Sequence, residues 1–129
     1  MTAYLDSSFL LAIAFGEPGG ATLQRILGRH DRVLSADLIV AECLSSIHRE
    51  SLDDDSVMAL LHGVDFVFPP RSLAREMREA LDVGHLRGAG LWHVACTMYL
   101  ASTTRADVAF LSRDQTQRRV ARRLGFATP

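Results

Sequence analysis

The residues Ala3-Tyr4-Leu5-Asp6-Ser7-Ser8, at the start of the chain, give the first indication of the fold class. Its first three residues predict a short buried strand, and the apolar run over residues 9–15 predicts a helix directly after it. Asp6 therefore stands where a strand ends and a helix begins. In a parallel sheet, ligands bind at this carboxyl edge because the loops diverge there and leave a crevice. Asp is also a common helix cap, so the stretch alone supports either a cap or a site residue.

The same alternation of short strands and helices continues to the end of the chain. Helical patterns separate further strands, which are predicted over residues 32–35, 64–68 and 108–111, with a short last one at 126–127. This alternation indicates an α/β fold with a short parallel sheet of four to five strands and helices on both faces. No linker or internal repeat interrupts the pattern, so we expect a single domain over residues 1–129.

The composition predicts an ordinary globular protein, and its net charge excludes the strong positive field that is typical of nucleic-acid-binding proteins. The chain has 48% hydrophobic and 22% charged residues and a net charge of -1 at pH 7. All 14 basic residues are Arg, which genome composition explains without any phosphate-binding role. No basic leader precedes the first strand and no apolar run reaches the roughly 18 residues of a membrane span. We expect a cytoplasmic protein with no membrane contact, and Cys43 and Cys96 as buried thiols rather than a disulfide.

Two further carboxylates can reach the edge where Asp6 stands. Glu42 lies in an apolar part of the helix predicted over residues 38–49, and it has no basic residue four positions before it. Asp114 follows the strand predicted over residues 108–111, so it repeats the strand-acid-helix order of the opening stretch. A surface Glu and a second helix cap remain the alternatives for these two residues.

Three carboxylates at one sheet edge repel each other unless a cation lies between them. Hard divalent ions prefer oxygen ligands and keep several waters for chemistry. The predicted cofactor is therefore Mg²⁺, with Mn²⁺ as a substitute. The acidic run Asp53-Asp54-Asp55 is a weaker candidate, because consecutive side chains point in different directions and acids favour a helix start.

Four motifs in order make the chain resemble a PIN domain. They are Tyr4-Leu5-Asp6-Ser7-Ser8, Ala41-Glu42, the segment from Leu86 to Ala95 that contains Trp92-His93-Val94-Ala95, and Phe110-Leu111-Ser112-Arg113-Asp114 followed by Gln117. The chain is most similar to the VapC-type toxins of bacterial toxin-antitoxin pairs. That resemblance implies a PIN-like three-layer α/β/α fold and a metal-dependent endoribonuclease that cuts tRNA or rRNA. It also implies inhibition by a cognate antitoxin, a homodimer, and contact with DNA only through the antitoxin.

The resemblance assigns roles to individual residues. Asp6, Glu42 and Asp114 match the acidic positions that hold the metal and carry catalysis, and Ser7 and Ser112 are expected to orient those carboxylates. The family has a further acid three positions before the histidine of its third motif, and here that position is Gly90. We therefore expect impaired cleavage.

Several readings stay open. A PIN fold that no longer cuts could serve as a binding module for an antitoxin. Its helices over residues 10–27 and 57–61 carry more apolar residues than one core face needs, which fits a groove for a partner helix. A flavodoxin-like signalling domain would also place acids at a sheet edge, but it would ordinarily supply a Lys, which this chain lacks. His93 follows a core-like stripe and is expected to be a buried core histidine rather than a metal ligand. The arginines at positions 118, 119, 122 and 123 fit a solvated helix face better than an RNA contact.

Overall fold

The computed structural model describes residues 1–129 and contains one four-stranded sheet in which every pair of neighbouring strands is parallel. Its strands lie in the order β3-β2-β1-β4, with the bounds β1 Thr2–Leu5, β2 Arg32–Ser35, β3 Asp65–Phe66 and β4 Val108–Leu111. This arrangement confirms the predicted α/β class and gives four strands. The predicted last strand at 126–127 contributes only an isolated bridge between Ala109 and Ala127.

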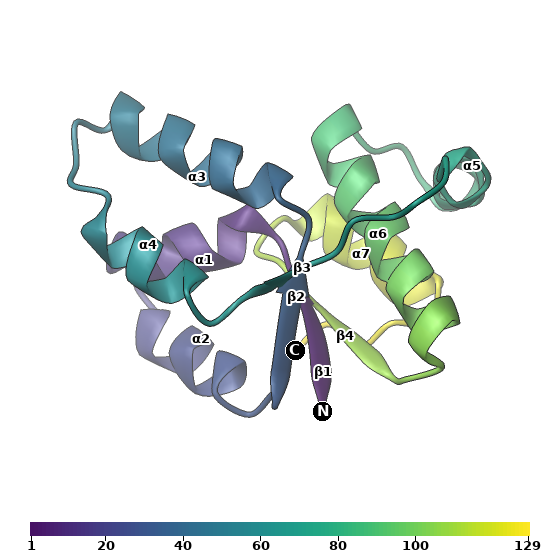
Figure 1. Cartoon of the computed structure of the whole chain (residues 1–129), viewed down its shortest axis with the longest axis horizontal. Coiled ribbons are helices and arrows are strands. Elements are labelled where there is room, and N and C mark those ends of the chain that lie inside the picture. The colour runs from purple at the N-terminus through teal and green to yellow at the C-terminus, as the bar shows by residue number, and fades with distance from the viewer.

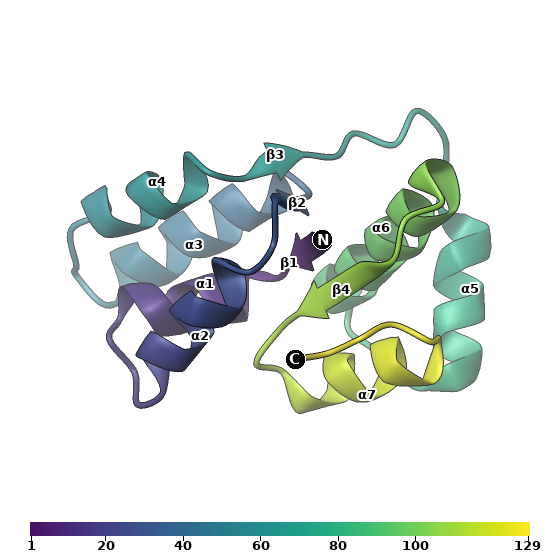
Figure 2. The same cartoon turned by 90° about the horizontal axis from the view of Figure 1, so that it is seen from below.

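Seven helices cover the two faces of the sheet (Figures 1 and 2). They are α1 Ser7–Ala14, α2 Gly20–Leu27, α3 Leu38–Arg49, α4 Asp55–Leu61, α5 Ala74–Val83, α6 Gly88–Thr104 and α7 Gln115–Arg123. Helices α1 to α4 lie on one face and α5 to α7 on the other, which makes three layers. None of them combines the length and apolarity that crossing a bilayer requires.

The alternation of side chains along β1 gives each face its own core. Ala3 and Leu5 belong to the buried cluster under α1 to α4, whereas Tyr4 belongs to the cluster under α5 to α7. Successive residues of a strand point to opposite faces, so a central strand needs apolar residues throughout. All three side chains are fully buried.

The edge strand β3 is shorter than the predicted strand over residues 64–68. Regular pairing covers two residues, and the last ladder hydrogen bond runs from Val67 N to Ser35 O over 2.8 Å. Pro69 and Pro70 follow and have no N–H to donate, so pairing stops there.

The central strands bring distant parts of the chain to one edge. Leu5 and Leu111 are partners in the ladder between β1 and β4, and Asp6 N donates to Leu111 O over 2.9 Å just past the strand ends. One residue separates α1 from β1 and three residues separate α7 from β4, while α3 and the first turn of α6 approach the same edge from opposite layers. This edge holds the candidate site.

Candidate functional site

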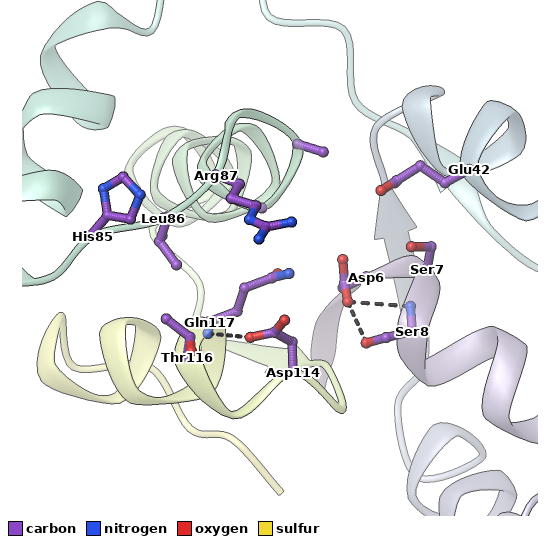
Figure 3. A pocket seen from close by; sticks show the side chains of 12 residues that line it. Asp6, Ser7, Ser8, Glu42, His85, Leu86, Arg87, Asp114, Thr116 and Gln117 are labelled. Carbon is purple, nitrogen blue, oxygen red and sulfur yellow. Dashed lines mark hydrogen bonds between the residues drawn. The ribbon is translucent and has the colours of Figure 1, made fainter.

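A pocket of about 470 Å³ opens at the carboxyl edge of the sheet (Figure 3). The residues to which the resemblance assigns a role in the metal site line it, except Ser112, which is fully buried. The complete lining is Asp6, Ser7, Ser8, Glu42, His85, Leu86, Arg87, Ala89, Gly90, Asp114, Thr116 and Gln117. Residues from four helices and the two central strand ends therefore meet in one place.

Asp6 is held by one of its two carboxylate oxygens. Its Oδ2 accepts hydrogen bonds from Ser8 Oγ at 2.5 Å, from Ser8 N at 3.3 Å and from Ser112 Oγ at 3.0 Å. Its Oδ1 has no hydrogen bond, and the nearest basic atom is His93 Nε2 at 3.8 Å. Asp6 is only 2% exposed. It caps α1 with one oxygen and leaves the other free, so the cap and the site are compatible.

Ser8, rather than the expected Ser7, orients this carboxylate together with Ser112. The Ser8 hydroxyl also accepts from Arg113 N at 2.9 Å and lies 3.2 Å from Ser112 Oγ, which ties the start of α1 to the loop after β4. Ser7 lines the pocket without a hydrogen bond to Asp6 or Glu42. Successive residues at the start of a helix point in different directions, and the sequence did not show which of the two serines faces Asp6.

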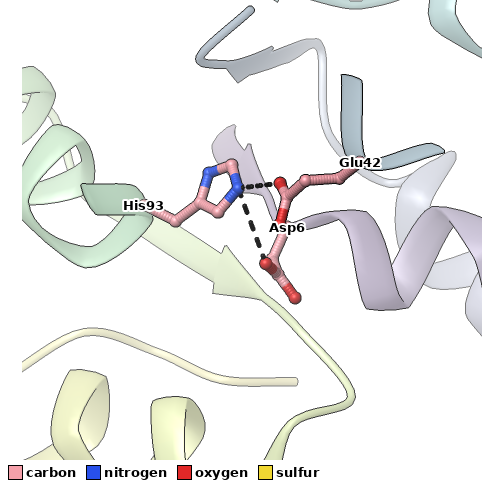
Figure 4. Close-up of side chains that lie close together, drawn as sticks. All are labelled: Asp6, Glu42 and His93. Carbon is pink, nitrogen blue, oxygen red and sulfur yellow. Dashed lines mark hydrogen bonds and ion pairs between the residues drawn. The ribbon is translucent and has the colours of Figure 1, made fainter. Parts of the chain in front are cut away.

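Glu42 is positioned by a buried histidine (Figure 4). His93 Nε2 lies 2.5 Å from Glu42 Oε1, and His93 Nδ1 lies 2.8 Å from the Tyr4 hydroxyl. Ala36 N donates to the same hydroxyl at 3.0 Å, so the Tyr4 hydrogen is free to reach His93 Nδ1. His93 Nε2 then carries the ring hydrogen and donates it to Glu42.

His93 is fully buried, and its place in the core agrees with the expectation. Its contact with Glu42 was missed, although the spacing holds a signal. His93 lies three residues after Gly90 on α6, so both residues face the same side of the helix. The ligand atoms of Asp6, Glu42 and His93 all lie within 4.8 Å of one another.

Asp114 lines the same pocket but stands outside this close group. Its Oδ1 accepts from Gln117 N at 2.9 Å and caps α7, and the residue is exposed. The structure therefore brings Asp6 and Glu42 together and leaves Asp114 on the facing wall (Figure 3). Its second carboxylate oxygen makes no hydrogen bond within the chain.

The centre of the pocket carries carboxylates that no arginine of the fold neutralises. No Arg forms an ion pair with Asp6 or Glu42, whose only such contact is with His93. Burial, together with the charges of Glu42 and Asp6, raises the pKa of the neighbouring Cys43 thiol to about 12. Arg87, at the start of α6, points its guanidinium into the pocket without reaching either carboxylate (Figure 3).

The acidic run Asp53-Asp54-Asp55 lies elsewhere, at the start of α4, and is exposed. Asp53 Oδ1 accepts from Asp55 N at 2.8 Å, so the run serves the helix start. None of these three residues lines the pocket at the carboxyl edge of the sheet.

Comparisons with known proteins agree with this architecture. The family model for the PIN domain matches residues 3–123. The crystal structure of VapBC2 from Rickettsia felis bound to a DNA fragment from their promoter contains a chain with a similar fold. The TM-score is 0.68 and the identity 9%, over 100% of this chain and 98% of that chain. A search of curated protein sequences gave no match. Since the family model spans nearly the whole chain, this protein belongs to the PIN domain family.

Proposed function

We propose that this chain is a metal-dependent endoribonuclease of the VapC toxin type, folded as one domain over residues 1–129. The observation that carries the proposal is the pair Asp6 and Glu42, which lie together at the bottom of a pocket with no Arg neutralising them. Carboxylates gathered in this way are tolerated when a cation lies between them.

The residues fit a hard divalent cation. The available donors are carboxylate oxygens, and Asp6 Oδ1 is left without a hydrogen-bond donor. Mg²⁺, with Mn²⁺ as a substitute, prefers such oxygen ligands. Asp6 and Glu42 would hold the ion, with Asp114 contributing from the facing wall of the pocket.

The bound cation would supply positive charge against the scissile phosphate and activate water for attack. Side chains of the protein orient the carboxylates and bind the substrate. Ser8 and Ser112 keep Asp6 in one orientation, and His93 does the same for Glu42. Arg87 points into the pocket, where its guanidinium can bind a phosphate oxygen of the substrate.

The arginines of α7 divide into two pairs with different contacts. Arg118 Nη2 and Arg122 Nε donate to Thr128 at 3.0 Å each, so this pair holds the C-terminal segment. Arg119 and Arg123 instead line a second hollow of about 370 Å³, where Arg123 Nη1 donates to Val83 O over 3.1 Å. That hollow shares His85 and Thr116 with the first pocket, so the two adjoin. We assign Arg119 and Arg123 to the RNA backbone beside the cleaved bond.

The expected partners follow from the VapC-type assignment. We propose that a cognate antitoxin inhibits the chain, that the chain acts in the cytoplasm as a homodimer, and that it meets DNA only through the antitoxin. The similarity to a chain of the Rickettsia felis VapBC2 structure supports the proposed antitoxin partner. Exposed apolar side chains on α3, on α4 and between them are available for a protein partner; these are Leu44, Leu52 and Met58.

Cleavage by this chain should be weak, because Gly90 brings no carboxylate to the pocket. A non-cleaving binding module is the second candidate function, and the same glycine favours it. The two differ in whether the purified chain cuts RNA at all when Mg²⁺ is supplied.

The test is a titration of Mg²⁺ and Mn²⁺ against a panel of tRNAs and rRNA fragments. We expect cleavage that requires the metal, that stops with EDTA and that Asp6→Asn abolishes. The matched control is Asp107→Asn, an exposed carboxylate just before β4, at the opposite edge of the sheet. Cleavage that survives Asp6→Asn would overturn the assignment of the site. Metal and antitoxin binding without any cleavage would establish the binding module instead.

A further inference from the structure

The side chain of Gln117 occupies the space that a side chain at position 90 would need. A Cβ added to Gly90 would lie 3.0 Å from both Cδ and Nε2 of Gln117 and 3.2 Å from its Cγ. These distances are shorter than ordinary van der Waals contacts. Figure 3 shows Gln117 reaching from α7 into the pocket, between Asp114 and Arg87 and toward Asp6. The residue missing from α6 is thus replaced in space by a residue of α7.

The start of α7 holds Gln117 in this position. Its backbone N–H donates to Asp114 Oδ1 at 2.9 Å, so the carboxylate that lines the pocket also orients the residue that fills it. On the other side, Gly90 is buried in the first turn of α6. The Gln117 side chain lies against a surface that exists only because position 90 has no side chain.

The amide oxygen of Gln117 is a hydrogen-bond acceptor without a donor. Oε1 is buried and has no hydrogen-bond partner in the chain. Buried polar atoms without a partner are rare in folded proteins, so each one points to a water, an ion or a ligand. An amide oxygen is an acceptor only, and amide oxygens are regular ligands of hard divalent cations.

We propose that Gln117 supplies the oxygen ligand that the acidic residue of position 90 supplies elsewhere in the family. This inference rests on the proposed function, because it takes the same divalent cation that Asp6 and Glu42 would hold. The exchange of a carboxylate for an amide keeps an oxygen in the pocket and removes one negative charge. The chain would therefore bind a divalent cation, with lower affinity than a site with four acids.

The direct test measures Mn²⁺ affinity by the electron paramagnetic resonance signal of the free ion, with no RNA present. Gln117→Leu removes the oxygen at similar volume and should weaken Mn²⁺ binding about tenfold, whereas Gln117→Glu should strengthen it about tenfold. Gln115→Leu is the matched control, since Gln115 is an exposed residue of the same first turn. Unchanged affinity in Gln117→Leu would overturn the inference, and thermal unfolding of each variant checks that it folds.

A second comparison uses the contact between the two residues. Gly90→Asp alone must displace Gln117, so it should raise Mn²⁺ affinity less than Gly90→Asp combined with Gln117→Ala. If Gly90→Asp alone gains as much as the double variant, Gln117 does not occupy the place of the acid. If the unaltered chain binds no Mn²⁺ at all, the proposed metal site falls, and this inference falls with it. Binding that needs Asp6 but ignores Gln117 removes this inference alone.

Discussion

Two buried acidic sites in this protein differ in whether arginines of the same chain neutralise them. Glu76, on α5, is 3% exposed, and its Oε1 lies 2.6 Å from Arg71 Nη2 and 3.4 Å from Arg75 Nη2. The hydrogen bond from Arg71 is the main reason why the pKa of Glu76 falls to about 2. The fold therefore supplies the cations for this carboxylate from the same chain.

Asp6 is as buried as Glu76, at 2% exposed, yet no arginine approaches it. Its partners are hydroxyls and a backbone N–H, and Glu42 beside it is met only by His93. The contrast separates two kinds of buried acid. A structural carboxylate is neutralised within the fold, whereas the carboxylates of this pocket are oriented but left for a cation from solution.

The largest expected effect comes from removing the charge of Asp6. Asp6→Asn should lower RNA cleavage at least about 100-fold, because the cation loses its most buried ligand. The free energy of unfolding should stay the same or rise, since repulsion with Glu42 is relieved. Gel-based cleavage assays and urea unfolding measure the two quantities. A large loss of stability would show that Asp6 is structural, like Glu76.

Divalent cations should stabilise the folded chain through the pocket. At a Mn²⁺ concentration of about 100 times its Kd, the gain in unfolding free energy should be about 2.7 kcal/mol. Thermal unfolding with and without Mn²⁺ measures this gain. Asp6→Asn should abolish this gain and Glu76→Gln should preserve it. The reverse pattern would show that the cation binds at Glu76 and not at Asp6.

Glu76→Gln should lower the free energy of unfolding at pH 7 by about 1–2 kcal/mol, because a charged hydrogen bond is lost to a half-exposed arginine. The pKa of Glu76 is lower in the folded chain than its ordinary value of 4.5. Its contribution is therefore complete above pH 4.5 and is lost as the pH falls toward about 2. Unfolding midpoints across this range should fall less steeply in Glu76→Gln than in Glu79→Gln, which changes an exposed residue of the same helix.

The smallest effect concerns arginines that have no acidic partner. Arg119→Gln and Arg123→Gln should each reduce the salt slope of single-stranded RNA binding by about 0.7, because each removes one phosphate contact. Arg49→Gln, an exposed arginine paired with Glu50, should leave the slope unchanged. Fluorescence anisotropy at several salt concentrations measures the slope. Equal slopes in all three variants would return Arg119 and Arg123 to a solvated helix face.

Local patterns predicted a large part of this fold. The strands around Asp6 and Asp114 are where the sequence predicts them, because apolar runs and turn residues act over a few positions. The helix over residues 72–83 shows the limit of such patterns. The four-residue spacing of Leu73, Met77 and Leu81 predicts its apolar side, but Leu81 is 41% exposed and Glu76 is buried instead. A strict four-residue spacing drifts around a helix of 3.6 residues per turn.

Short-range periodicity and strand-helix junctions were sufficient to predict the α/β class, the parallel sheet and the set of acids at its carboxyl edge. Three features could be recognised only in the folded chain: His93 holds Glu42, Ser8 rather than Ser7 holds Asp6, and Gln117 fills the space beside Gly90. The contacts of His93 with Glu42 and of Gln117 with Gly90 join elements from different parts of the chain, and Ser8 is fixed by Arg113 N and Ser112 from the loop after β4. Their distances follow from how the layers pack, and no local pattern encodes that packing.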